Sequence, residues 1–211
     1  MSESIEPPPS SQEPQSTVFV VDDDAAVGAA LAQAVPLLGW PVQVYASAAA
    51  FLAEYQPDQP GCLVLDVRMP GMTGLELQRM LADDGVELPI VMISGHADVR
   101  IAVEAMTLGA ITLLEKPFGL DELLTHVRQA IEKDRTDRAE RQKRTEAGGR
   151  LSNLTPKERE VLEMVVAGKT NRDMATELGL SMRAVEDRRA RLMKKAGART
   201  IAELVHLFAS R

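Results

Sequence analysis

The sequence is poor in cysteine, histidine and aromatic residues, and each shortage argues against a class of protein. Its one cysteine, Cys62, allows no intramolecular disulfide and favours a reducing compartment. The chain has three histidines and no cluster of cysteine and histidine, so we expect no zinc site. Aromatic residues make up 3% of the chain, so leucine, valine, isoleucine, alanine and methionine must form most of its core.

Segments that direct a chain to a membrane are also missing. No apolar run reaches the roughly 20 residues that a membrane-spanning helix needs. The first 16 residues have neither the basic start nor the apolar centre of a signal peptide. We therefore expect a cytoplasmic protein with no membrane partner. Because segment 1–16 is rich in proline, serine and glutamate, we expect it to be a disordered tail.

Charge is distributed unevenly along the 211 residues, a length that favours one or two domains. Segment 151–211 has 12 basic and 8 acidic residues, a net charge of +4, whereas segment 1–150 has 12 basic and 23 acidic residues, a net charge of −11. An acidic body with a small basic C-terminal part suggests two different tasks. Counts alone do not exclude a chance asymmetry.

Segment 17–130 alternates short apolar runs with stretches of helical periodicity. This alternation is typical of an α/β domain with a parallel sheet. The runs predicted as strands are 17–21, 41–45, 62–66, 89–94 and 110–115. The stretches predicted as helices are 25–38, 48–55, 74–82, 98–108 and one that begins near residue 120.

Segment 131–150 is charged but keeps the spacing of a helix. Acid-to-base pairs four residues apart support a solvated helix, and they are Asp134–Arg138, Asp137–Arg141 and Glu140–Arg144. Apolar residues at heptad positions are missing, which disfavours a coiled coil. We expect a helical linker that ends at Gly148 and Gly149.

Segment 151–211 has only helical patterns and forms a second domain in this interpretation. Thr155 begins a capping box with Glu158, and Pro156 takes the first helical position. A short helix over 171–178 and a tight turn precede a basic amphipathic helix near 182–197. The apolar residues predicted to form its core are Leu162, Val165, Met174, Leu178, Val185, Leu192, Leu204 and Leu207.

Polar side chains stand where the predicted strands of the first domain end. Ligands of parallel sheets bind at the carboxyl ends of the strands. The strand ends carry Asp22, Asp23 and Asp24, then Asp66, then Ser94, and finally Glu115 and Lys116. Clustered carboxylates need a cation, and oxygen ligands select a hard ion such as Mg²⁺.

An aspartate beside such an ion can accept a phosphoryl group, whose charge then needs a lysine and hydroxyl donors. Lys116 and Ser94 would supply them. Each residue alone has an ordinary explanation, because Asp24 suits the N-cap of the next helix and a single Lys116 is more often a solvated charge. The combination at the strand ends makes chance a poor explanation.

The first domain resembles the receiver domain of bacterial response regulators. The matching stretches are VVDDD (20–24), VLDVRMPGMTGLEL (64–77), ISGHADVRIAVEAM (93–106) and LLEKPF (113–118). The resemblance implies a flavodoxin-like (βα)₅ fold. It implies that Asp66 accepts a phosphoryl group from a sensor histidine kinase.

The resemblance also implies a set of supporting residues. Mg²⁺ would be held by Asp23, Asp66 and the backbone carbonyl of Arg68, with Asp22 assisting through water. Ser94 would move onto the phosphoryl group, Lys116 would balance its charge, and the Lys116–Pro117 peptide would be cis. Receivers usually carry tyrosine or phenylalanine at the position of Leu113, so the switch formed by Ser94, Leu113 and Pro117 departs from the family pattern.

The C-terminal domain resembles the helix-turn-helix module of LuxR and NarL regulators. The matching stretches are LTPKEREVL (154–162), GKTN (168–171), MATELGLS (174–181) and LMKKAGA (192–198). A receiver followed by this module is the layout of FixJ-type regulators. The resemblance implies that the helix near 182–195 lies in the major groove of double-stranded DNA.

The residues predicted to contact DNA are Lys169, Arg183, Arg188, Arg189, Arg191, Lys194 and Lys195, together with Glu186 and Asp187. Glu186 and Asp187 are followed by two arginines, whereas relatives usually place an aliphatic residue and then histidine after the glutamate. Family base preferences are therefore not transferred to this chain. A solvated basic helix that binds nothing is the alternative interpretation.

The function favoured by the sequence is a transcriptional regulator switched by phosphorylation of Asp66. The resemblance implies a homodimer formed on phosphorylation through the fourth helix and fifth strand, with RNA polymerase as a further candidate partner. We expect no enzyme activity beyond the receiver's own phosphoryl transfer and autodephosphorylation. Two alternatives stay open: constitutive DNA binding without phosphorylation, and, less favoured, a Mg²⁺-dependent phosphatase with Asp22 as nucleophile, in which Asp66 would lack a role.

Overall fold

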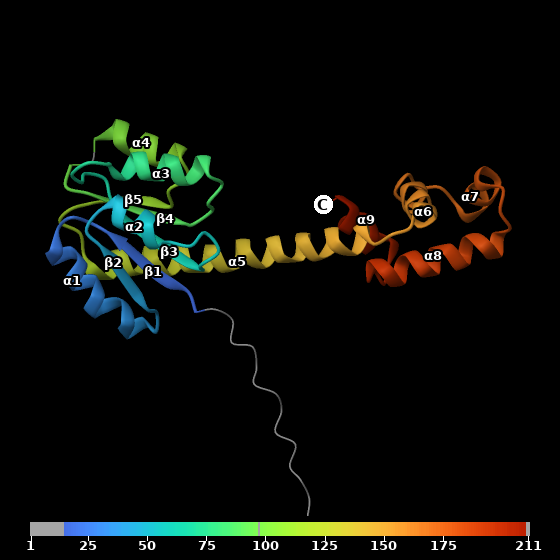
Figure 1. The fold of residues 1–211 in the computed structure, drawn as a ribbon, viewed down its shortest axis with the longest axis horizontal. Coiled ribbons are helices and arrows are strands. Elements are labelled where there is room, and N and C mark those ends of the chain that lie inside the picture. Colours follow the sequence, from blue (N-terminus) through green and yellow to red (C-terminus); the bar gives the residue numbers. More distant parts are fainter. Residues whose placement is uncertain (1–14, 97, 210–211) are drawn as a thin grey trace, which may run out of the picture. The chain divides into compact units, whose positions relative to one another are not determined.

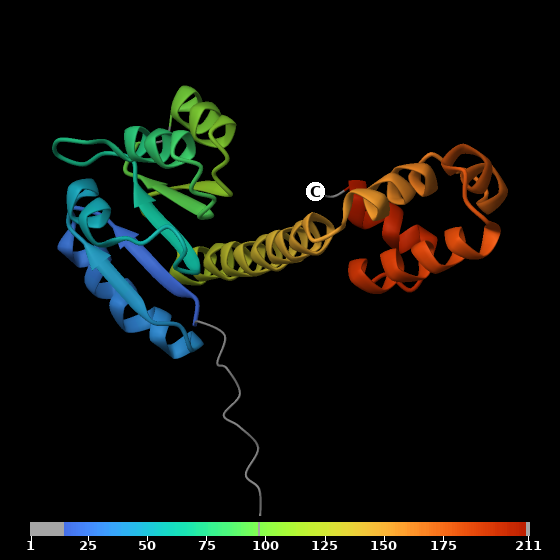
Figure 2. The same ribbon diagram turned by 45° about the vertical axis from the view of Figure 1, so that its right-hand side comes forward.

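The computed structural model describes residues 15–96 and 98–209 (Figures 1 and 2). The chain divides into two compact units, with the boundary between Thr136 and Asp137. The predicted tail 1–16 lies almost wholly outside the described residues.

The first unit is an α/β domain built on one five-stranded sheet. The strands are β1 (Thr17–Val21), β2 (Val42–Tyr45), β3 (Gly61–Asp66), β4 (Ile90–Ser94) and β5 (Thr112–Glu115). All neighbouring strands run parallel, in the order β2-β1-β3-β4-β5. The helices that alternate with them are α1 (Ala25–Ala34), α2 (Ala48–Glu54), α3 (Gly74–Asp83), α4 (Val99–Thr107) and α5, which begins at Leu120. The predicted flavodoxin-like fold is confirmed.

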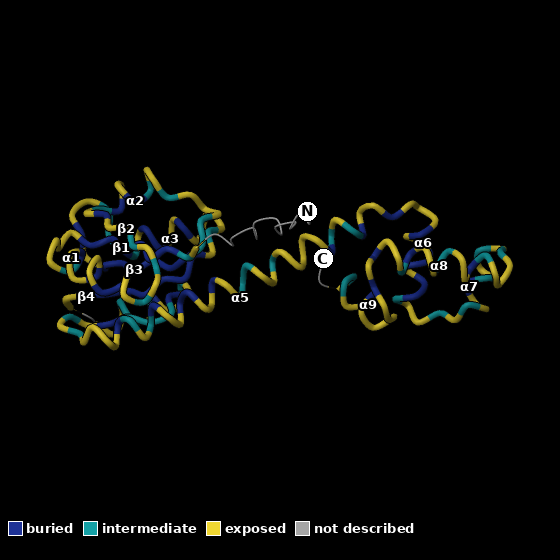
Figure 3. The backbone as a smooth tube through the Cα atoms, turned by 90° about the horizontal axis from the view of Figure 1, so that it is seen from below, coloured by how far each residue is buried: buried dark blue, intermediate teal, exposed yellow. Residues whose placement is uncertain are grey.

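Helices cover both faces of this sheet. One core contains Phe51 of α2, Leu77 of α3 and Ala105 of α4, while the other contains Leu31 of α1 and Leu123 of α5. Strands β1 and β3 are buried along their whole length, because alternate side chains enter opposite cores. The tube coloured by burial shows the central strands as the buried part of this unit (Figure 3).

The helix predicted over 25–38 is interrupted in the structure. Helix α1 ends at Ala34, and η1 (Val35–Leu38) continues the chain as a 3-10 turn. Pro36 has no backbone N–H to donate to the preceding turn, so an α-helix cannot continue through it unchanged. Gly39 then ends the turn in the left-handed region, at φ 87°.

Helix α5 spans Leu120–Ser152, and the boundary between the two units falls inside it. The prediction that Asp134 lies on a solvated face is wrong, since its exposure is 0%. Its Oδ2 accepts a hydrogen bond of 2.9 Å from the backbone N–H of Gly61, where β3 begins. Asp134 thus continues the buried stripe of α5 that contains Leu123 and Val127.

The expected helix end at Gly148 and Gly149 is also wrong. Helix α5 continues through both glycines to Ser152. Ala147 and Leu151 on either side of the pair are buried, and Leu151 belongs to the core of the second unit. Burial of this last turn outweighs the low helix propensity of glycine, about 1 kcal/mol per residue relative to alanine.

The second unit packs the end of α5 with four short helices around a separate core. They are α6 (Pro156–Val166), α7 (Asn171–Leu178), α8 (Met182–Ala196) and α9 (Ile201–Ala209). The predicted capping box at the start of α6 is present, with Thr155 as N-cap and Glu158 bonding back to it. The residues predicted for this core are buried or packed against it. Between residues 15 and 209, leaving out 97, we find no helix with the length and apolar character to cross a membrane.

Candidate functional site

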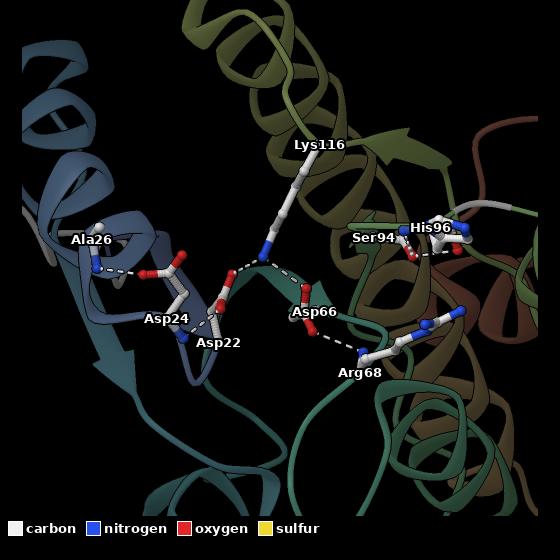
Figure 4. A network of polar contacts seen from close by, with 8 residues as sticks. All are labelled: Asp22, Asp24, Ala26, Asp66, Arg68, Ser94, His96 and Lys116. Atoms are coloured by element: carbon white, nitrogen blue, oxygen red, sulfur yellow. Dashed lines mark hydrogen bonds and ion pairs between the residues drawn. The ribbon is translucent and has the colours of Figure 1, made fainter.

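Side chains from three strand ends meet at one edge of the sheet. Because β1 and β3 are paired with Val21 opposite Leu65, the residues that follow, Asp22 and Asp66, lie side by side. Lys116, just after β5, extends between them (Figure 4). Its Nζ is 2.8 Å from Oδ2 of Asp22 and 2.8 Å from Oδ1 of Asp66.

Local hydrogen bonds fix the aspartates after β1. Oδ1 of Asp22 accepts the backbone N–H of Asp24 at 2.8 Å. The carboxylate of Asp24 accepts the backbone N–H of Ala26 at 2.9 Å, so Asp24 is the N-cap of α1 as predicted. Asp22 is therefore buried and oriented toward Lys116, while Asp23, which lies between Asp22 and Asp24 in the sequence, is exposed.

Asp66 is held in place by the loop that follows β3. Its Oδ2 accepts the backbone N–H of Arg68 at 2.7 Å, and its side chain is 5% exposed. The loop then returns to Gly74, where a Cβ atom would lie 2.2 Å from the carbonyl oxygen of Asp66. Glycine at 74 lets the first turn of α3 approach Asp66, a requirement that helix periodicity alone did not identify.

Opposing effects set the charge state at this edge. Burial raises the pKa of the Asp22 carboxyl, and the hydrogen bond from Lys116 offsets part of that rise. Desolvation would lower the pKa of the Lys116 ammonium, but its hydrogen bonds to Asp22 and Asp66 outweigh this and raise the pKa. Lys116 therefore stays protonated at neutral pH and balances part of the carboxylate charge.

The acidic side chains at this edge fit a hard divalent cation. Asp22, Asp23 and Asp66 each offer a carboxylate oxygen, and these oxygens lie within 4.8 Å of one another. Oxygen-only ligand sets of this kind suit Mg²⁺. The backbone N–H of Arg68 bonds to Asp66, which places the Arg68 backbone at the same edge.

Ser94, at the end of β4, turns its hydroxyl toward the following loop. Its Oγ donates to the carbonyl of His96 at 2.9 Å and accepts the N–H of His96 at 3.2 Å (Figure 4). Leu113 of β5 is partly buried and packs against the core that contains Ala105 of α4. The peptide between Lys116 and Pro117 is cis, as expected.

Helix α8 of the second unit has a buried face and a charged, exposed face. Val185, Leu192 and Ala196 face the core. Several residues predicted to contact DNA lie on the exposed side, and they are Arg183, Glu186, Asp187, Arg191 and Lys194. Arg188 is half-buried at the margin.

Three of the predicted DNA contacts are paired with side chains elsewhere in the unit. Lys169 forms an ion pair with Glu177, and the guanidinium of Arg189 donates to the side-chain oxygen of Asn171. Lys195 forms an ion pair of 2.8 Å with Glu158. The sequence did not reveal these pairings, because each joins residues from different helices or turns.

Comparison with known families agrees with this division of the chain. Residues 18–128 match the response regulator receiver domain, and residues 152–208 match the luxR family of bacterial regulatory proteins. The chain belongs to the FixJ-type response regulators. It is 42% identical over 190 residues to the transcriptional regulatory protein FixJ of Azorhizobium caulinodans, covering 90% of each chain.

Other proteins match this response regulator over most of their length. It is 37% identical over 192 residues to the response regulator protein TodT of Pseudomonas putida, covering 91% of this chain and 85% of TodT. Among solved structures, the response regulator StyR matches with a TM-score of 0.84 and 38% identity, covering 93% of this chain and all of that one. Full-length FixJ from B. japonicum matches with a TM-score of 0.57 and 37% identity, over 92% of this chain and 96% of that one.

Proposed function

We propose that this response regulator controls transcription through phosphorylation of Asp66 by a sensor histidine kinase. The observation that carries the proposal is the position of Lys116, whose ammonium bridges Asp66 and Asp22. A buried carboxylate held next to a fixed cation is suited to accept a phosphoryl group, because the cation offsets the charge that arrives. We also propose that the protein works in the cytoplasm, where promoter DNA is found.

In the proposed reaction, a carboxylate oxygen of Asp66 forms a bond to phosphorus while the bond from phosphorus to the kinase's histidine nitrogen breaks. That nitrogen keeps the electron pair. The N–H of Arg68 holds Oδ2 of Asp66, so the orientation of the carboxylate is set before the donor arrives. Lys116 balances the added charge, and water later hydrolyses the acyl phosphate. No other catalysis is proposed.

Mg²⁺ would be held by Asp23, Asp66 and the Arg68 carbonyl, with Asp22 acting through water, and it would supply charge neutralisation for the phosphoryl oxygens. The chain contributes the arrangement of the ligands. The bond from the Asp24 N–H orients the Asp22 carboxylate. Burial at the strand ends keeps bulk water from screening the charges.

The proposed output is a homodimer on promoter DNA, with RNA polymerase as a candidate partner. In α4, the side chains of Val99, Val103 and Met106 are 79%, 60% and 49% exposed. Their spacing places them on one face of the helix. This exposed apolar face supports dimerisation through α4 and β5, which would bring two DNA-binding domains to paired half-sites.

The proposal is tested by intact mass after incubation with acetyl phosphate and Mg²⁺, followed by size-exclusion chromatography with mass detection. We expect one phosphoryl addition and a shift toward dimer in the wild type and in Asp83→Asn, an exposed acid of α3. Asp66→Asn should show neither. A phosphoryl addition that persists in Asp66→Asn would refute the assignment.

Constitutive DNA binding is the second candidate. The leucine at 113 favours it, because this position has no aromatic side chain that could move together with the Ser94 hydroxyl. A DNA-binding assay on the phosphorylated and the unphosphorylated protein separates the two candidates. If phosphorylated protein binds promoter DNA no better than unphosphorylated protein, control by phosphorylation is refuted and the constitutive candidate stands. A phosphatase with Asp22 as nucleophile is disfavoured, because it would leave Asp66, whose carboxylate is held by Lys116 and by the N–H of Arg68, without a role.

A further inference from the structure

The exposed stripe of α8 has an acid at its centre. At 100° per residue, Arg183, Asp187, Ala190 and Lys194 share one direction, opposite to the buried Val185 and Leu192. All members of the stripe are exposed. Ala190, one turn from Asp187, is small and lets the helix approach a flat partner closely.

Among residues 15–96 and 98–209, the carboxylate of Asp187 has no hydrogen bond or ion pair. Its backbone carbonyl, by contrast, accepts from Nε of Arg191 at 3.2 Å. Two basic residues at the margins are already paired, Lys195 with Glu158 and Arg189 with Asn171. The acid at the centre of the stripe is therefore available to a ligand.

An acid at the centre of a DNA-facing surface weakens phosphate binding unless it gains a donor from the bases. Cytosine presents such a donor in the major groove, its N4 amino group. In a G·C pair this amino group has an acceptor, guanine O6, on one side only. In an A·T pair the amino group lies between two acceptors, which repel a carboxylate. Cytosine is therefore the favoured partner of an aspartate.

We propose that Asp187 is a specificity-determining residue that accepts a hydrogen bond from cytosine N4, so that each half-site carries cytosine opposite it. The inference rests on the DNA-binding role proposed above. Arg183 and Lys194, four and seven residues away on the same stripe, would contact phosphates on either side and set the register of the helix.

The test is selection of bound duplexes from a randomised pool by the full chain, with and without acetyl phosphate. Wild type should enrich cytosine at one position of each half-site. Asp187→Ala should lose that preference by about tenfold while other positions keep theirs. Asp187→Asn should move the preference to adenine, because an amide pairs with the adenine edge.

Glu163→Ala is the matched control, because it removes the same charge from an exposed position of α6 that is not among the predicted DNA contacts. It should leave base preference unchanged. If Asp187→Ala strengthens binding to all sequences and keeps the cytosine preference, Asp187 only repels phosphates and the inference is overturned while DNA binding stands. If wild type enriches no sequence in either state, the proposed sequence-specific DNA binding is overturned together with the inference.

Discussion

Removing the carboxylate of Asp134 should destabilise the receiver domain. Its exposure is 0%, and Oδ2 accepts the N–H of Gly61 at 2.9 Å. In Asp134→Ala that buried donor loses its charged acceptor. Loss of a hydrogen bond to a charged group costs about 1.5–3 kcal/mol, and relief of carboxylate desolvation returns part of this. We expect a net loss of about 2 kcal/mol in the free energy of unfolding.

The single tryptophan makes the measurement specific to this unit. Trp40 packs against the core that contains Leu31 and Val127, so its fluorescence reports unfolding of the receiver domain in the full chain. With a urea m value of about 2 kcal/mol per molar, a loss of about 2 kcal/mol lowers the midpoint by about 1 M. The m value itself should stay unchanged.

Glu132→Ala is the matched control on the same helix, because Glu132 is exposed. Its effect should stay within about 0.5 kcal/mol. Asp134→Asn keeps an acceptor for Gly61 and should fall between Asp134→Ala and the wild type. A midpoint of Asp134→Ala that equals that of Glu132→Ala would show that the buried carboxylate contributes nothing net, and the reasoning would be refuted.

Two further predictions concern the second unit. Arg183→Ala should weaken binding to all DNA sequences and lower the slope of log affinity against log salt concentration by about one. Arg189→Ala, which removes the donor to Asn171, should instead lower the thermal stability of the unit. If the two variants have equal effects in both assays, this distinction is wrong. The bond to Lys195 and those within the capping box lower the pKa of Glu158 to about 2 from 4.5. The ionised Glu158 carboxylate therefore stabilises the second unit fully above pH 4.5, and this stabilisation is lost as the pH falls toward 2. Melting temperatures measured by circular dichroism should fall over this pH range, and Glu158→Gln should reduce that dependence.

The sequence predicted the fold because its apolar pattern is regular. Five apolar runs separated by helical spacing leave few arrangements other than a parallel sheet, and polar residues at the ends of those runs must then share one edge. Asp22, Asp66 and Lys116 come together for this reason, although 50 residues separate the last two. The N-caps Asp24 and Thr155 were equally predictable, since capping depends on residues a few positions apart.

Features that depend on tertiary contacts were not predictable. Asp134 looks like part of a solvated ion pair, and only the position of Gly61 at the start of β3 shows why it is buried. Arg189 looks like a DNA contact until Asn171 of α7 is placed beside it. In both cases the decisive partner lies on another element and carries no periodic signal.

The leucine at 113 does not by itself uncouple Ser94 from the rest of the receiver. The backbone of Ser94 is fixed, because its carbonyl accepts the N–H of Lys116 at 2.7 Å, so only the side chain is free to change partners. A hydroxyl that turned toward a phosphoryl group on Asp66 would give up both of its bonds to His96, each a contribution of about 1 kcal/mol. Asp98 caps α4, and the exposed apolar face of that helix begins at Val99, five residues after Ser94. The bonds between Ser94 and His96 would therefore respond to phosphorylation of Asp66 without an aromatic ring at 113.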